Sequence, residues 1–402
     1  MSSSTRVSTP SRGRFASKPY LLAACGAAIF TYQGGRDIVN VLLPAIQVDF
    51  GLSYTALGLV AASYDWGHAS MLLLGGYLSD RYGKKRCLLI GLAWFILANA
   101  SIGLSPSPWL LTGLRFATGV AFGTYFVAGN SLLAEAFVPS ERGRAIGLHY
   151  AGGSAGRFII PIVGGMITVS LGWQLAFLPL SLTAAVAAVL FLLLRSPAQV
   201  SLQATGSAWE TLWKIVLRNR QVIKVSAIQF LVIFANMAVI FVPVYLVRTW
   251  NLAISEAAIY TGIAALAGIP ASPIVGELSD RLGWNRVVMV TLAADGLLLG
   301  IFPFVAPGPV LVMVLLGLGI VNRSISVVLA VATRASEPSH RAMSLGLVNT
   351  VGLLSLTVLS VLGGYIADVV GLSATFLFIA LVAVVSCAVL GTTKLGRLDL
   401  RW

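Results

Sequence analysis

Charged residues are scarce in this chain of 402 residues: they make up 10% of it, against 57% for hydrophobic residues. An ordinary soluble domain is about a quarter charged. The mean hydropathy of +0.90 agrees with this difference. The composition therefore excludes a typical soluble domain and indicates an integral membrane protein.

Residues and motifs that serve catalysis, metals or nucleotides are also few. The three histidines lie in separate segments, and Cys25, Cys87 and Cys387 lack the spacing of a metal site or a disulfide framework. The sequence has neither a glycine-rich phosphate-binding pattern nor a nucleophile elbow. These absences argue against an enzyme and against an ATP-driven pump, and no cofactor is expected.

Basic residues are in excess, with a net charge of +13. Such an excess would suit a nucleic-acid partner, but its placement argues otherwise. Most Lys and Arg residues fall in the tails and loops that we assign to the cytoplasm, and only Arg248 falls on the other side. The excess is thus the positive-inside bias of membrane proteins, and no nucleic-acid partner is predicted. Four arginines fall inside apolar runs: Arg36, Arg115, Arg157 and Arg323.

Long apolar runs dominate the chain, and about 20 apolar residues suffice for a spanning helix. The twelve runs that qualify are 19–46, 54–77, 86–104, 109–135, 144–168, 172–194, 223–247, 255–277, 285–305, 308–332, 343–367 and 370–392. An even number of spans with basic ends predicts a multi-pass protein of the cell inner (plasma) membrane with both termini cytoplasmic. The predicted domains are a disordered tail 1–18, a six-helix bundle 19–195, a cytoplasmic linker 196–222, a second six-helix bundle 223–392 and a tail 393–402.

Two loops repeat one pattern at half the chain length. Residues Gly76–Arg86 recur as Gly276–Arg286, with Gly, Asp, Arg and Gly at matching positions 200 residues apart. Residues Pro139–Arg142 recur as Pro338–Arg341, 199 residues apart. A shared offset near half the length indicates a duplicated unit. In a membrane protein, this is typical of secondary transporters.

The first loop resembles the signature of the major facilitator superfamily, G-x-L-x-D-R-x-G-(R/K)-(R/K). The second resembles its weaker copy, with Trp284 and Asn285 in place of the basic pair. Through the repeat, the resemblance covers the whole chain. It implies an all-α membrane protein with the major facilitator fold, two pseudo-symmetric six-helix transmembrane bundles around a cavity lined by helices 1, 4, 7 and 10. It also implies a monomer that works by alternating access, and it says nothing of the substrate.

The repeated loops are predicted to act as the conformational switch. Gly83 allows a tight turn between two helices, and Asp80 can stabilise a helix N-terminus or pair with an arginine. We expect the loops to connect the bundles when the cavity opens outward and to separate when it opens inward. The alternative is that the basic cluster only sets the topology. The predicted switch residues are Gly76, Asp80, Arg81, Gly83, Arg142, Asp280, Arg281, Gly283 and Arg341.

Ionisable residues inside spans are costly unless paired or hydrated, so they mark candidate sites. Helix 1 carries Arg36 and Asp37, and helix 2 carries Asp65. Each aspartate is either a proton-coupling group or part of a neutralising ion pair, for Asp65 with Arg36 or Arg157. Arg115 on helix 4 resembles a family motif whose arginine takes part in proton coupling in some members, and a bond to a backbone carbonyl is the alternative.

Arg157 on helix 5 and Arg323 on helix 10 lie near mid-span in opposite bundles. A buried guanidinium needs a carboxylate. Two that face a shared cavity would hold a substrate carboxylate, with Arg36 as a third substrate-binding arginine. The alternative is that each pairs within its own bundle, for instance with Asp65 or Asp295.

Polar amides form a second set of candidate substrate-binding residues. Gln229 and Asn236 share one stripe of helix 7, and Asn349 lies on helix 11. These side chains either donate hydrogen bonds to a polar substrate or stabilise helix packing.

Two functions compete on this basis. Three buried arginines against two aspartates favour a proton-coupled transporter of a small organic anion, with protons and the lipid bilayer as its other partners. The alternative is a drug/proton antiporter for lipophilic or cationic compounds, which rests on Arg115, the aspartates and the resemblance of Gly147–Gly165 to the family's antiporter motif. A cation exporter would offer its substrate an unpaired carboxylate. A membrane sensor or an intramembrane enzyme is disfavoured, because the tails hold no output domain and no catalytic set converges.

Overall fold

The computed structural model describes residues 18–194, 218–236, 240–337 and 341–392, without the side chains of residues 73, 76, 77, 80, 139, 140, 236, 341 and 342. The predicted tails up to residue 17 and from residue 393, and most of the linker, lie outside the described residues. The described residues are helical throughout, apart from turns. This confirms the predicted all-α membrane fold.

The first six predicted runs correspond to six helices of the N-terminal bundle. These are α1 (Lys18–Phe50), α2 (Tyr54–Tyr82), α3 (Lys84–Ile102), α4 (Pro108–Ala136), α5 (Pro139–Leu171) and α6 (Leu178–Leu193), the last preceded by the 3₁₀ turn η1 (Leu175–Phe177). Local sequence explains several helix starts. Ser53 and Ser107 each accept a backbone N–H of the first turn, and Pro108 opens α4, where a missing N–H costs nothing.

The other six runs form the C-terminal bundle, with two of them interrupted. Its elements are α8 (Arg220–Asn236), α9 (Val242–Trp250), α10 (Ile254–Leu282), α11 (Trp284–Ile301), η4 (Phe302–Phe304), α12 (Pro309–Val321), α13 (Ser324–Ala335), α14 (Arg341–Val369) and α15 (Leu372–Thr392). The predicted seventh span is divided into α8 and α9, and the tenth into α12 and α13. The second break is a tight turn in which the Arg323 N–H donates to the Ile320 carbonyl.

Nine helices of the described chain are long and apolar enough to cross a membrane. The helices α1 and α2 are not among them, because Arg36, Asp37 and Asp65 lower their mean hydropathy. The charged residues of α1 and α2 therefore make these two spans less apparent from hydropathy than the other long helices.

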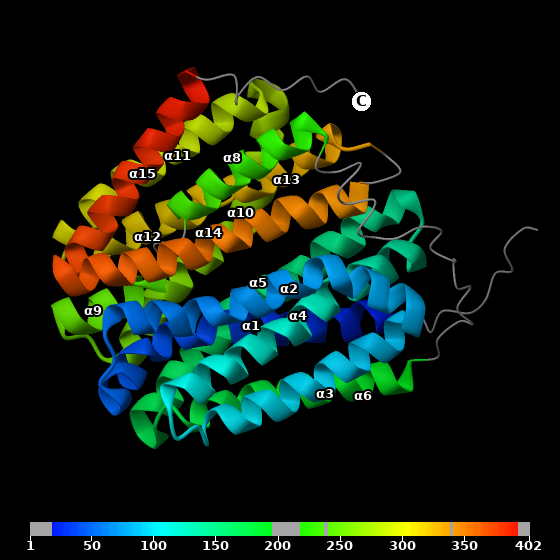
Figure 1. The fold of residues 1–402 in the computed structure, drawn as a ribbon, viewed down its shortest axis with the longest axis horizontal. Helices are drawn as coiled ribbons and strands as arrows, with labels where there is room; N and C mark the ends of the chain where they lie inside the picture. Colours follow the sequence, from blue (N-terminus) through cyan, green and yellow to red (C-terminus); the bar gives the residue numbers. More distant parts are fainter. Residues whose placement is uncertain (1–17, 195–217, 237–239, 338–340, 393–402) are drawn as a thin grey trace, which may run out of the picture.

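The two bundles lie side by side and meet along two helix pairs (Figure 1). Helix α2 packs along α14, and α5 packs along α10. Glycines permit the close approach: a Cβ on Gly58 would lie 2.0 Å from the Ser360 carbonyl oxygen, and one on Gly364 would lie 2.3 Å from that of Tyr54. Both contacts are near the end of the bundles away from the termini, which we call the distal end.

The repeated loops have matching backbone geometry. Gly83 ends α2 with a φ of 95°, and Gly283 ends α10 with a φ of 88°. Both values lie in the region that favours glycine. This confirms that Gly83 makes the predicted tight turn, and the second copy does the same.

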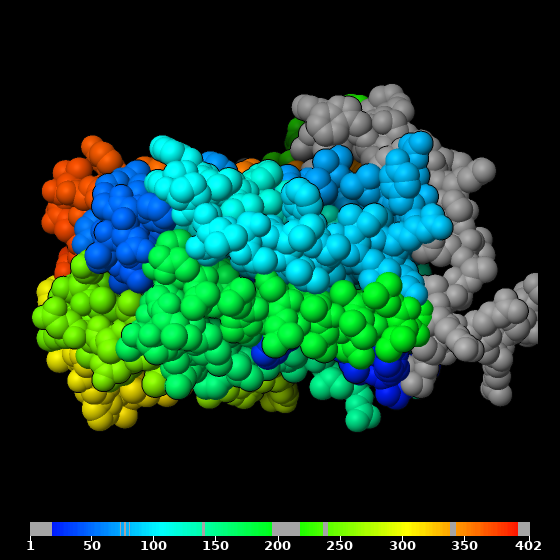
Figure 2. Space-filling view, turned by 90° about the horizontal axis from the view of Figure 1, so that it is seen from below, coloured from blue at the N-terminus to red at the C-terminus, as the bar shows by residue number. Residues whose placement is uncertain are grey.

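The outer face of the N-terminal bundle is apolar. Figure 2 shows α3 in blue and cyan beside α6 in green on this face. Its exposed large side chains include Ile90, Trp94, Leu182 and Val186. Such a face suits contact with lipid chains.

Candidate functional site

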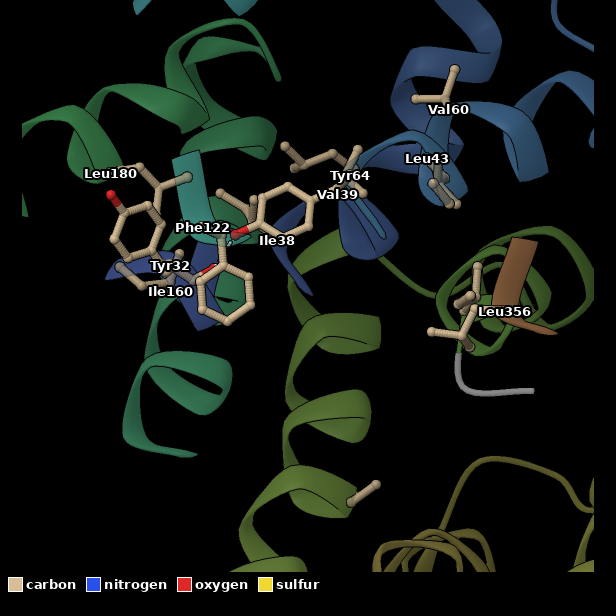
Figure 3. Packing of buried hydrophobic residues seen from close by; sticks show 14 of the residues in the cluster. Tyr32, Ile38, Val39, Leu43, Val60, Tyr64, Phe122, Ile160, Leu180 and Leu356 are labelled. Atoms are coloured by element: carbon tan, nitrogen blue, oxygen red, sulfur yellow. Dashed lines mark hydrogen bonds between the residues drawn. The ribbon is translucent and has the colours of Figure 1, made fainter. Parts of the chain in front are cut away.

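Helix α1 is held in the N-terminal bundle by buried aromatic side chains. Tyr32 of α1 stacks on Phe122 and Tyr125 of α4, and the Tyr64 hydroxyl donates to the Tyr32 carbonyl over 2.8 Å. Figure 3 shows Tyr32, Phe122 and Tyr64 in this packing. Rigid packing at this level supports the charged residues that follow one turn later.

Arg115 fixes the same part of α1 through its backbone. Its Nη1 donates to the Gly35 carbonyl over 2.6 Å and its Nη2 to the Arg36 carbonyl over 3.2 Å. Its guanidinium lies 4.7 Å from the centroid of the Tyr64 ring. The carbonyl-bonding alternative for Arg115 is thus what the structure shows, and Arg115 does not line the cavity described below.

Arg36 forms a two-pronged ion pair with Asp65. Its Nε donates to Oδ1 over 2.8 Å and its Nη2 to Oδ2 over 3.3 Å. The side chains are 15% and 6% exposed. The pair joins α1 to α2 and satisfies both carboxylate oxygens of Asp65, as the ion-pair alternative supposed.

Asp37, the next residue of α1, accepts a single hydrogen bond from α5. The Arg157 Nε of α5 donates to its Oδ2 over 2.6 Å, and the side chains are 25% and 17% exposed. Arg36 pairs with Asp65 of α2 and Asp37 with Arg157 of α5, so α1 takes part in two ion pairs. Of the two aspartates, Asp37 is the more accessible and has fewer bonds.

Arg323 comes from the opposite bundle, at the break between α12 and α13. It forms no hydrogen bond or ion pair with a described residue, and its buried Nε is without an acceptor there. It interacts electrostatically with Arg157 and with Asp37. The structure therefore brings the two predicted carboxylate-binding arginines together, and Arg157 also pairs within its own bundle, as the alternative supposed.

These side chains line one cavity between the bundles. Its volume accessible to the centres of water molecules is about 50 Å³, which suits a few waters rather than an organic substrate of several carbons. Three arginines (36, 157, 323) and two aspartates (37, 65) line it, so their formal charge is +3 − 2 = +1. The residues that complete its polar lining are Asn40, Thr261 and Asn322.

Sequence reasoning did not assign these last three residues to the site. Asn40 and Asn322 neighbour buried charges in the sequence, and this proximity was a usable signal. No comparable sequence signal marks Thr261. Threonine is common in helices, where its hydroxyl can donate to a carbonyl of the preceding turn, as Thr261 does to Ala257. Its place in the cavity depends on the packing of α10.

Two of the predicted amide ligands, Gln229 and Asn349, do not line the cavity. Gln229 is fully buried in the C-terminal bundle against Gly352, and Asn349 donates to the Leu345 carbonyl of its own helix. The side chain of Asn236 lies outside the described residues. Asp295 is buried in α11, away from the cavity lining.

Two of the switch residues, Asp280 and Arg281, form ion pairs within their own bundle. Asp280 accepts from Arg334 Nη2 over 2.9 Å, and Arg281 pairs with Glu277. Arg81 lies over the ring of Tyr82. The buried Nε of Arg142 has no partner among the described residues. The side chains of Asp80 and Arg341 lie outside the description.

Polar contacts between the bundles are found at the distal end. Asp368 of α14 accepts the backbone N–H groups of Tyr54 and Thr55 over 2.7 and 2.9 Å, so it caps α2 of the other bundle. Arg248 of α9 donates to the Gln47 side chain of α1 over 3.0 Å. These bonds hold the distal side closed.

A family model matches most of the chain. The model of the Major Facilitator Superfamily matches residues 25–327. A bacterial homologue of the human lysosomal transporter Spinster, solved in an inward-facing and occupied conformation, has a similar fold. The TM-score is 0.74, at 18% identity over 92% of this chain and 95% of that one.

Curated relatives fall into two functional groups. A probable galactarate/D-glucarate transporter of Bacillus subtilis is 26% identical over 84% of this chain and 82% of its own length. A probable sulfoacetate transporter of Cupriavidus necator is 26% identical over 68% of each chain. The multidrug resistance protein Stp of Mycobacterium tuberculosis is 36% identical over 39% of this chain, a match that spans 29% of that relative's length.

Proposed function

This chain belongs to the major facilitator superfamily and is a multi-pass membrane transporter rather than an enzyme, and we propose that it carries a small organic anion together with protons. The observation that carries the proposal is the charge of the cavity. Arg36 and Arg157 each have an aspartate, whereas Arg323 has no acidic partner among the described residues. A buried cation of this kind is stabilised by an anionic substrate.

The relatives that match the larger share of this chain support an anionic substrate. Two of them are described as transporters of galactarate/D-glucarate and of sulfoacetate, both of which are organic anions. Carboxylate and sulfonate groups both accept hydrogen bonds from guanidinium groups. We therefore expect the substrate to carry at least one such group.

Asp37 is the proposed coupling residue. A substrate anion that binds Arg157 and Arg323 competes with Asp37, whose bond to Arg157 is single. In the proposed cycle, the displaced Asp37 carboxylate carries the coupling proton. Asp65, with both oxygens bonded to Arg36, instead has a structural role in this proposal.

Alternating access supplies the transport step. The bonds of Asp368 and Arg248 hold the distal side closed. In the proposed orientation, with the termini in the cytoplasm, this side is external, and we interpret the present state as closed to the outside. Substrate entry then requires the bundles to separate, because the present cavity is too small for an organic anion of several carbons.

Proteoliposomes that enclose a pH-sensitive dye test the proposal. D-glucarate, D-glucuronate and sulfoacetate are added outside, and tetraphenylphosphonium is added in a parallel series. Acidification of the lumen with an anion, lost in Arg157→Ala, is the expected result. An unchanged lumenal pH with every anion would contradict the proposal that the substrate is an organic anion.

Drug/proton antiport is the second candidate. It is supported by the match to the multidrug resistance protein Stp. In the same assay, it predicts alkalinisation of the lumen on addition of tetraphenylphosphonium, because protons leave as the cation enters.

A further inference from the structure

The guanidinium of Arg323 lies directly against the backbone of Gly268 in α10. A Cβ atom on Gly268 would lie 2.7 Å from Arg323 Cζ, 2.8 Å from Nη2 and 2.9 Å from Nε. Atoms that are not hydrogen-bonded do not approach so closely. The guanidinium can lie in this position because residue 268 is glycine and has no side chain.

Few other contacts hold Arg323 in this place. It has no hydrogen bond or ion pair with a described residue; across the cavity, Arg157 repels it and Asp37 attracts it. Arg323 begins at the break between α12 and α13, and its guanidinium contacts α10 at Gly268. Helix α10 therefore prevents the guanidinium from moving farther from the cavity. The remaining direction of movement is into the cavity that Arg323 lines.

We propose that Gly268 is a positioning residue that sets the distance between Arg323 and Arg157, and thereby the size of anion that the cavity accepts. The proposal rests on the proposed function, since it assumes that Arg323 binds the substrate anion. Any side chain at position 268 moves the guanidinium towards Arg157. This movement shortens the space for an anion and increases the repulsion between the two cations.

The first test measures the position of Arg323 without any substrate. Phenylglyoxal enters the cavity when the bundles separate and modifies accessible arginines, and mass spectrometry of the purified protein reports the extent of modification at Arg323. Gly268→Ala should raise this extent several-fold, because the head group moves into the cavity. Gly300→Ala is the matched control in the same bundle, since its Cβ would meet only the Ala380 Cβ at an ordinary 4.0 Å. Equal labelling of wild type and Gly268→Ala overturns the proposal, whatever the substrate.

The second test measures selectivity in the proteoliposome assay. Gly268→Ala should raise KM for the six-carbon anion D-glucarate by about 10- to 100-fold, the scale expected for a misplaced binding group, and raise it less for the two-carbon anion sulfoacetate. A purely structural role would lower the maximal rate or the amount of folded protein and leave the ratio of the two KM values unchanged. If Arg323→Ala leaves anion transport intact, the proposed function fails. If Arg323→Ala abolishes transport while Gly268→Ala leaves both KM values unchanged, only the positioning role fails.

Discussion

Each arginine of the cavity has a different set of partners, and these partners decide what its removal does. Arg157 binds Asp37, whereas Arg323 has no ion pair with a described residue and interacts with Asp37 only across the cavity. Arg157→Ala and Arg323→Ala should each weaken anion binding at least about 30-fold, because a buried charge loses its partner. Equilibrium binding of radiolabelled D-glucarate to purified protein measures this. Arg144→Ala, at an exposed position of α5, is the control. Unchanged affinity in both variants would remove the carboxylate-binding role.

The partners of Asp65 and Asp37 likewise predict different roles for these two residues. Asp65→Asn leaves Arg36 buried without its ion pair and should destabilise the protein by about 3–5 kcal/mol, seen as a lower melting temperature.

Asp37→Asn affects the more accessible pair and should preserve most of the stability. The Asp37→Asn variant should no longer accumulate the anion in response to a proton gradient, while exchange of the anion across the membrane continues. Accumulation at the wild-type level in Asp37→Asn would show that the proton is carried elsewhere.

At the scale of elements, the glycine contacts between α2 and α14 determine how closely the bundles approach at the distal end. A Cβ on residue 364 would lie 2.3 Å from the Tyr54 carbonyl oxygen, which belongs to backbone and cannot move aside easily. Gly364→Ala should therefore oppose distal closure and shift the population towards the outward-open state.

Spin labels on exposed positions 48 and 369 report this shift as longer distances in double electron–electron resonance, in a background without the three native cysteines. Gly113→Ala, where a Cβ meets open space, serves as the control. An unchanged distance distribution in Gly364→Ala would mean that these contacts do not govern the closure.

For the whole molecule, alternating access requires an opposite set of contacts at the end that carries the termini. In the present state, Asp280 and Arg281 pair within their own bundle, as the predicted cycle requires for an inward-directed cavity. Asp80→Asn should reduce the transport rate several-fold while leaving expression nearly unchanged, since the turn itself depends on Gly83. Initial rates normalised to protein amount test this, and a normal rate would exclude a switching role for the loop.

The fold could be predicted from the sequence because its signals are local or periodic. Apolar runs determine which segments span the membrane, glycines at 83 and 283 determine the tight turns, and the shared offset reveals the duplication. The sequence does not predict the break between α12 and α13, because apolar residues continue through this segment and hydropathy does not record a local change of backbone hydrogen bonding.

The buried charges of the site were also evident in the sequence, since ionisable residues in lipid-spanning segments are costly. Their pairing was not, because it depends on which helix faces meet. Only the tertiary structure joined Arg36 to Asp65 and Asp37 to Arg157, directed Arg115 to the carbonyls of α1, and left Arg323 beside Gly268. Sequence alone determined that charges lie inside the membrane, and helix packing decided which of them have partners.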